Sequence, residues 1–251
     1  MKVLASDFDG TLYFENVEGH YKKEDIIAIK KFQSAGHKFG VCTGRPYMGI
    51  SHFMSKDIHI DFYITNSGAC VYDGDGNILI KNDMPIVGVK ELLKLYPNQR
   101  AVIMCNNKVY VKNDFNHVFG DASFRATLEN DDALNKEIIF GTSFHFDTEE
   151  DAKKATQYVD ENIEGITAYQ NINDVDCVKT GCSKETGINE LRKLWDVKEE
   201  DVACVGDSYN DLPMLKAFKN SFTFTYSPSD VQSQAGHVVD QMCYAIEELL
   251  K

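Results

Sequence analysis

The sequence predicts an α/β protein: a core built on a parallel β-sheet, with an α+β region inserted into it. Strand and helix patterns alternate from the N-terminus to about residue 69 and again from about Lys179, which is typical of a parallel sheet with right-handed crossovers. Between these stretches, alternating strands pair around short polar turns. We therefore expect a core of residues 1–82 and 179–251 around an insertion at 83–178.

The N-terminal half of the core begins with a short apolar strand at 2–8 that ends in turn-forming residues. The segment 23–36 has apolar residues at helical spacing, acids in its first turn and Gly36 just past its end, so it predicts a helix. Two further strands are expected at 37–45 and 61–69.

The insertion and the second half of the core follow from the same signals. Hairpins are expected around the Gly/Asp/Asn turn of 68–83 and around Asn106-Asn107. The other elements expected up to the start of the second core half are a helix at 85–96, a strand at 136–147 and an acid-capped helix at 148–163. The second core half is expected to hold a helix at 182–195 with Ser183 as N-cap, a strand within 200–211, a helix at 211–219, a strand at 221–226 and a helix at 243–251.

The overall charge and the cysteines exclude several classes of protein. The chain has 251 residues and a formal net charge of −13, which argues against general binding to nucleic acids or anionic membranes. It has no apolar stretch long enough to span a bilayer and no secretory signal at its N-terminus. The seven cysteines are scattered and form no CxxC pair, so we expect free thiols in a cytoplasmic protein.

Polar motifs follow three of the expected core strands: DFDGT at 7–11, TGR at 43–45 and GDSYND at 206–211. The carboxyl ends of parallel strands form the edge where ligands bind, and the helices that follow point their N-terminal amides toward it. The side chains expected to meet at this edge are Asp7, Asp9, Thr43, Asp207 and Asp211.

Several carboxylates at one edge repel each other unless a cation lies among them. A set of oxygen ligands favours a hard divalent ion such as Mg²⁺. The ion would let an anionic phosphate approach, so that one carboxylate can attack phosphorus. A second carboxyl group two residues further on can protonate the leaving alcohol and later activate water.

With these motifs in order, and with a lysine in GCSKETG at 184, the chain closely resembles the haloacid dehalogenase (HAD) superfamily of phosphohydrolases. The segment TNSGACVYD is similar to the corresponding strand of the Cof-like branch, whose large α/β cap is inserted between the second and third motifs. The resemblance covers essentially the whole chain. It implies a Rossmann-like core (the HAD fold) with an inserted α+β cap domain that selects the substrate.

The resemblance also implies roles for individual residues. Asp7 would be the nucleophile and Asp9 the general acid/base. The expected Mg²⁺ ligands are Asp7, Asp9 through its main-chain carbonyl, Asp207 and Asp211. The expected phosphate-binding residues are Phe8, Thr43, Gly44, Lys184 and Asn210. Arg45 and Asn66 are candidates for contacts with the substrate.

Two segments depart from the family pattern. Ser67 intervenes where family members usually carry NGA, and FTFTYSPSD at 222–230 stands where the family tends toward GVAMGNA. We expect both to reshape the mouth of the site.

The leading functional hypothesis is a Mg²⁺-dependent phosphatase that hydrolyses a small phosphorylated metabolite through an aspartyl-phosphate. The metabolite would be a sugar phosphate or a phosphorylated cofactor, because a covering cap excludes macromolecules. One alternative is a phosphotransferase or sugar phosphomutase that re-uses the same intermediate. Another is a non-catalytic phosphometabolite-binding protein. The chain is expected to be a monomer or a small homo-oligomer.

Overall fold

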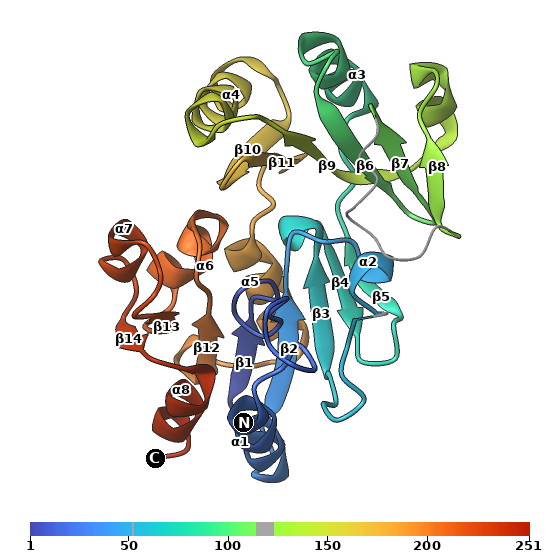
Figure 1. The fold of residues 1–251 in the computed structure, drawn as a ribbon. Helices are drawn as coiled ribbons and strands as arrows, with labels where there is room; N and C mark the ends of the chain where they lie inside the picture. The colour runs from blue at the N-terminus through green and yellow to red at the C-terminus, as the bar shows by residue number, and fades with distance from the viewer. Residues whose placement is uncertain (52, 114–122) are drawn as a thin grey trace.

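The structure is a computed structural model that describes residues 1–51, 53–113 and 123–251. Its larger sheet has eight strands in the order β14-β13-β12-β1-β2-β3-β4-β5 (Figure 1). The bounds are β1 Val3–Ser6, β2 Lys38–Cys42, β3 Phe62–Thr65, β4 Cys70–Asp73, β5 Ile78–Lys81, β12 Val202–Val205, β13 Asn220–Phe224 and β14 His237–Val239. Strands β14 to β3 are parallel, and the β4–β5 hairpin extends the sheet in the antiparallel sense.

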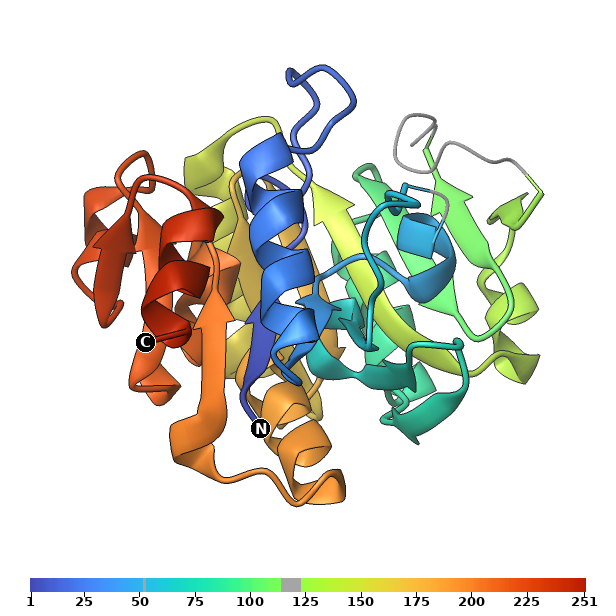
Figure 2. The same cartoon turned by 90° about the horizontal axis from the view of Figure 1, so that it is seen from below.

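Helices cover both faces of this sheet. Helices α1 (Lys23–Ser34) and α8 (Met242–Leu249) lie side by side on one face (Figure 2). Helices α5 (Lys184–Leu194) and α6 (Leu212–Ala217) pack on the other. Strand β1 serves both layers by simple alternation: Leu4 packs with the α1/α8 cluster, and Val3 and Ala5 pack with the α5/α6 cluster.

The smaller sheet has six strands in the order β10-β11-β9-β6-β7-β8. Their bounds are β6 Arg100–Cys105, β7 Val109–Lys112, β8 Arg125–Thr127, β9 Ile139–His145, β10 Ile166–Asn171 and β11 Asp174–Lys179. All its pairs are antiparallel except β7–β8. Helices α3 (Ile86–Leu95) and α4 (Glu149–Asn162) cover the face that points away from the larger sheet (Figure 1).

Alternation also divides the two faces of the smaller sheet. Ile103, Phe144 and Val175 point into the apolar layer under α3 and α4. Their neighbours along the strands point the other way, toward the larger sheet, and this second face carries Ser143 and Asp176. This face is turned toward the carboxyl ends of the core strands; it is polar at β9 and β11, whereas β6 and β7 place Val102, Met104, Val109 and Val111 on it.

The predicted α/β class is confirmed. The domain division at 83–178 stays a prediction, which the two sheets support; Lys179 still belongs to the last strand of the smaller sheet. Within the described ranges the remaining short elements are α2 (Tyr47–Ser51), α7 (Ser229–Gln232) and four 3₁₀ turns. Strands β8, β10, β11 and β14 were not predicted.

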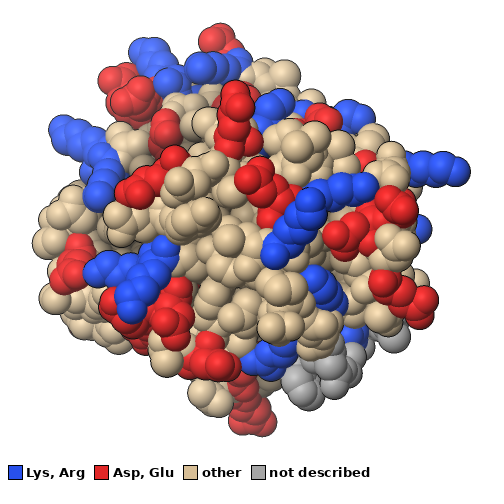
Figure 3. Space-filling model, turned by 90° about the horizontal axis from the view of Figure 1, so that it is seen from above, with Lys and Arg blue, Asp and Glu red and all other residues tan. Residues whose placement is uncertain are grey.

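The outer surface over the smaller sheet carries acidic and basic side chains interspersed (Figure 3). The excess of negative charge in the sequence therefore does not gather on this face. None of the helices in the described ranges is both long and apolar enough to cross a membrane.

Candidate active site

The site lies where β1 and β12 end side by side. The register pairs Ser6 with Val205, and the N–H of Asp7 donates to the Val205 carbonyl over 2.9 Å. Asp7 therefore follows directly after β1, and Asp207 follows two residues after the end of β12. Parallel pairing of two strands distant in sequence thus brings the first and fourth motifs together.

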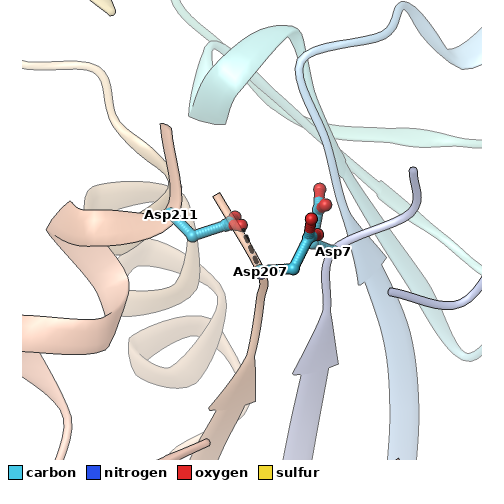
Figure 4. A group of neighbouring side chains, drawn as sticks. All are labelled: Asp7, Asp207 and Asp211. Carbon is cyan, nitrogen blue, oxygen red and sulfur yellow. Dashed lines mark hydrogen bonds between the residues drawn. The ribbon is translucent and has the colours of Figure 1, made fainter. Parts of the chain in front are cut away.

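Three carboxylates form the centre of the site (Figure 4). Asp7, Asp207 and Asp211 each offer one oxygen within 4.8 Å of the others. Asp211 is oriented by the chain itself, because its Oδ2 accepts hydrogen bonds from the N–H groups of Asp207 (2.9 Å) and Ser208 (3.0 Å). An all-carboxylate oxygen set of this size fits Mg²⁺, which prefers such ligands and keeps several waters.

Lys184 connects two of these carboxylates. It is the first residue of α5, where Ser183 and Thr186 form a capping box that fixes the helix start. Its buried Nζ lies 2.6 Å from Asp7 Oδ1 and 2.5 Å from Asp211 Oδ1. Burial alone would lower the pKa of Lys184, but the two carboxylates raise it above its ordinary value. The lysine therefore stays charged, directly behind the Asp7 carboxylate.

The acidic cluster has strongly perturbed carboxyl groups. Burial, and then the charge of Asp211, raise the pKa of Asp7 well above its ordinary value, while Lys184 opposes the shift. The same two causes raise the pKa of Asp207 to about 6. The raised pKa values mean that ionising several carboxyl groups here is unfavourable without further positive charge.

The loop after the nucleophile candidate packs closely on Asp207. Gly10 has φ +77°, and a Cβ on it would lie 2.7 Å from Asp207 Oδ2, so only glycine fits. The Thr11 hydroxyl donates to Asp207 Oδ1 over 2.7 Å. From the atypical segment 222–230, the Tyr226 hydroxyl donates to the Gly10 carbonyl over 2.6 Å. This segment thus supports the DFDGT loop.

Asp9 does not join the acidic cluster through its side chain. Arg45 holds it in a two-point contact, with Nε 2.8 Å from Oδ2 and Nη2 2.6 Å from Oδ1. The guanidinium also lies over the rings of Phe8 and Phe53, 5.5 and 5.4 Å from their centroids. The Asp9 side chain is 46% exposed and faces the cleft.

The phosphate-binding candidates differ in position. Thr43 and Gly44 line the cleft beside Asp7. Asn210 also lines it, and its buried Oδ1 has no hydrogen-bond partner in the described part of the chain. The Phe8 side chain instead is fully buried and stacks on Tyr13, so only its main chain is near the site.

Asn66 lies outside this cleft. It is buried and lines a second recess together with Tyr47 of α2 and Cys105 of β6. Asn66, Ser67 and Gly68 all have positive φ, at 49°, 49° and 93°. A Cβ on Gly68 would lie 1.9 Å from the Ser183 carbonyl. The turn is therefore pressed against the start of α5, and none of its three residues lines the cleft.

Above these motifs the face of the smaller sheet that carries Ser143 and Asp176 closes a cleft of about 620 Å³. Asp176 of β11 is 8% exposed, and a Cβ on Gly44 would lie 2.9 Å from its Oδ2. His145 of β9 lies beside it, with Nδ1 2.9 Å from Asp174 Oδ1. A carboxylate of the smaller sheet thus approaches the TGR loop directly.

Sequence reasoning missed Asp174 and Asp176 because it missed the hairpin that carries them. The turn between β10 and β11 has Ile172 at φ +55°, a position where Gly, Asn or Asp is the usual signal. The available signal was the alternation of DVDCVK at 174–179, which puts the two acids on one face and Val175 and Cys177 on the other.

We predict that Asp176→Asn stabilises the protein at neutral pH. Burial raises the pKa of Asp176 from 3.8 to about 6, so the folded protein holds this proton more tightly than the unfolded chain. Wild-type stability is therefore lost as the pH rises through that window, and the neutral amide avoids the loss. We expect a gain on the order of 2 kcal/mol at pH 7.5 and a smaller one at pH 5, measured by urea unfolding. The exposed Glu129→Gln serves as a control that should show no such dependence.

The structure thus combines a parallel-sheet core with an acid–lysine cluster at its strand ends, facing a separate sheet. The family model of the haloacid dehalogenase-like hydrolases matches residues 4–243. The chain belongs to this family, and within it to the Cof-like phosphatases, as its motifs predicted.

Similar proteins match the chain over nearly its full length. The 5-amino-6-(5-phospho-D-ribitylamino)uracil phosphatase of Escherichia coli is 26% identical over 94% of this chain and 89% of its own. A haloacid dehalogenase-like hydrolase from B. subtilis has the same fold, with a TM-score of 0.86 at 20% identity, over 99% of this chain and 100% of the other. A HAD subclass IIB sugar phosphatase gives 0.81 at 24% identity, over 99% and 95% of the two chains.

Proposed function

We propose that this protein is a Mg²⁺-dependent phosphatase of small phosphorylated metabolites that works through an aspartyl-phosphate on Asp7. The observation that carries the proposal is the position of the Asp7 carboxylate. It lies in a cleft, beside two further acids and within 2.6 Å of a buried lysine. The set combines a nucleophile, a ligand set for a divalent cation and a fixed positive charge for phosphate.

In the first step an Asp7 oxygen attacks phosphorus, and the bond from phosphorus to the leaving oxygen breaks. Asp9 gives its proton to that oxygen, which leaves as an alcohol. In the second step Asp9 removes a proton from water, which attacks the phosphoryl group and frees Asp7. Lys184, Thr43 and the Gly44 amide would hold the phosphoryl oxygens, with Asn210 in support.

Mg²⁺ would be held by Asp7, Asp207, Asp211 and the main-chain carbonyl of Asp9, and would supply the positive charge that lets a dianionic phosphate approach Asp7.

Asp9 can serve as an acid only if it gives up a bond to Arg45, because both its oxygens accept from the guanidinium. We therefore assign Arg45 the role of positioning Asp9 between turnovers.

The size of the cleft supports a small substrate. About 620 Å³ is in the range of sites for single metabolites. The similar proteins named for a sugar phosphate and for a phosphorylated uracil derivative support sugar phosphates or phosphorylated cofactors as the class. The seven cysteines are buried free thiols, which supports a reaction in the cytoplasm.

A screen for phosphate release over a panel of such metabolites, with Mg²⁺ and with EDTA, tests the proposal. We expect inorganic phosphate from some members with Mg²⁺ and at least about 100-fold less with EDTA. Transfer of phosphate to a sugar acceptor without release would indicate a phosphotransferase or mutase. Binding without Mg²⁺-dependent release would indicate a phosphometabolite-binding protein.

A further inference from the structure

The cleft is strongly acidic away from the proposed position of the phosphate. Among the described residues that line it, six carboxylates face one guanidinium and one imidazole. The acids are Asp7, Asp9, Glu15, Asp174, Asp176 and Asp207, and the basic groups are Arg45 and His145. Asp7 and Asp207 belong to the phosphate end, and Asp9 is paired with Arg45. The end of the cleft that would receive the leaving group therefore has a net negative charge.

Asp176 lies against the loop that is proposed to bind the phosphate. Its Oδ2 lies against Gly44, whose amide is assigned to the phosphoryl group. It stands on β11 opposite Ser143 of β9, on a regular strand pair. The atoms of a leaving group next to the phosphate must pass this carboxylate as they extend toward the smaller sheet.

The cost of burial outweighs a hydrogen bond from the Ser143 side chain and the charge of the buried Lys184, which both favour the ionised form of Asp176. His145 makes its contact with Asp174, 2.9 Å away and two residues before Asp176 on the same face. Arg45 is held by Asp9. An ionised carboxylate offers only acceptors, so a partner on the substrate must bring N–H or O–H donors.

We propose that Asp176 selects a neutral, hydroxyl-rich leaving group and excludes one that carries a second anion. The inference rests on the proposed function and names the substrate class for the same cleft. A polyol or sugar donates hydroxyl groups to Asp176. A carboxylate or second phosphate is repelled by it, because like charges at such an interface are costly.

A matched pair of substrates tests this selection. Sorbitol 6-phosphate and 6-phosphogluconate share six carbons and one phosphate ester, and they differ at the far end by CH₂OH against COO⁻. We expect the wild-type kcat/KM to favour the polyol ester by about tenfold or more, chiefly through KM. In Asp176→Asn the ratio should fall about tenfold because 6-phosphogluconate gains. Glu129→Gln, which removes an exposed carboxylate outside the cleft, should keep the wild-type ratio.

The outcomes separate this inference from the proposed function. Without Mg²⁺-dependent phosphate release from either ester or from p-nitrophenyl phosphate, the proposed function itself fails. If p-nitrophenyl phosphate is hydrolysed but the two esters are used equally, or neither is used, the selection is wrong. If the preference persists unchanged in Asp176→Asn, folded by its urea transition at pH 7.5, the assignment to Asp176 is wrong.

Discussion

Replacing Asp7 with asparagine is expected to lower kcat by on the order of 10⁴-fold or more while leaving the fold intact. The amide keeps the shape of the side chain and can still accept a hydrogen bond from Lys184, 2.6 Å from the native Oδ1. It cannot attack phosphorus, so the covalent route is lost. Because burial already makes ionisation of Asp7 costly, the neutral side chain should not destabilise the protein. Phosphate release and urea unfolding measure the two effects.

A second readout identifies the nucleophile itself. Wild-type protein quenched with acid during turnover should carry a phosphoryl group that hydroxylamine removes, as expected for an acyl phosphate, and Asp7→Asn should carry none. Asp75→Asn makes the same chemical change at an exposed turn and should match wild type in both assays. An Asp7→Asn protein that releases phosphate at a rate near wild type would show that water attacks phosphorus directly.

The core could be predicted because each strand and its end are marked by neighbouring residues in the sequence. Parallel pairing of the strands then determines which strand ends meet. Short apolar strands that end in DFDGT and GDSYND predict both the strand ends and the residues placed there. Parallel pairing of β1 with β12 then brings Asp7, Asp207 and Asp211 together across about 200 positions. Lys184 was expected only from the resemblance to the HAD superfamily, and the structure places it where its helix begins, beside Asp7 and Asp211.

The contacts between side chains could not be predicted in the same way. The ion pair of Arg45 with Asp9 joins two motifs that are far apart in the sequence. It depends on the direction of the Arg45 side chain, whose guanidinium lies over the rings of Phe8 and Phe53. Asn66 has the residue type of a substrate contact, yet its positive φ turns it into a different recess. Spacing in the sequence carries neither piece of information.

The smaller sheet was predicted only in part, for a related reason. Its regular hairpin β6–β7 and strand β9 have clear alternation, and both were expected. The hairpin β10–β11 turns at Ile172, a β-branched residue with positive φ, without a standard turn signal. Asp176, the residue proposed to select the leaving group, lies on the part of the protein whose strands are hardest to recognise.

Lys184→Met is expected to remove activity and stability together. The native ammonium is fully buried and contacts carboxylates of Asp7 and Asp211 at 2.6 and 2.5 Å. Methionine fills a similar volume but leaves two buried carboxylates without a counter-charge, at a cost of about 3–5 kcal/mol in EDTA. The variant also lacks the positive charge that Lys184 would place against the transferred phosphoryl group, and this loss should lower kcat about 10³-fold.

Adding Mg²⁺ distinguishes the contribution of Lys184 to stability from its contribution to phosphate binding. Ion bound among Asp7, Asp207 and Asp211 supplies charge to the orphaned carboxylates, so saturating Mg²⁺ should restore much of the urea stability of Lys184→Met. Turnover should stay low, because the ion does not occupy the lysine's position against the phosphoryl oxygens. Lys193→Met, at the exposed end of the same helix, should lose only a few tenths of a kcal/mol. Full activity of the Mg²⁺-saturated Lys184→Met protein would mean that Lys184 only offsets the acids and does not bind phosphate.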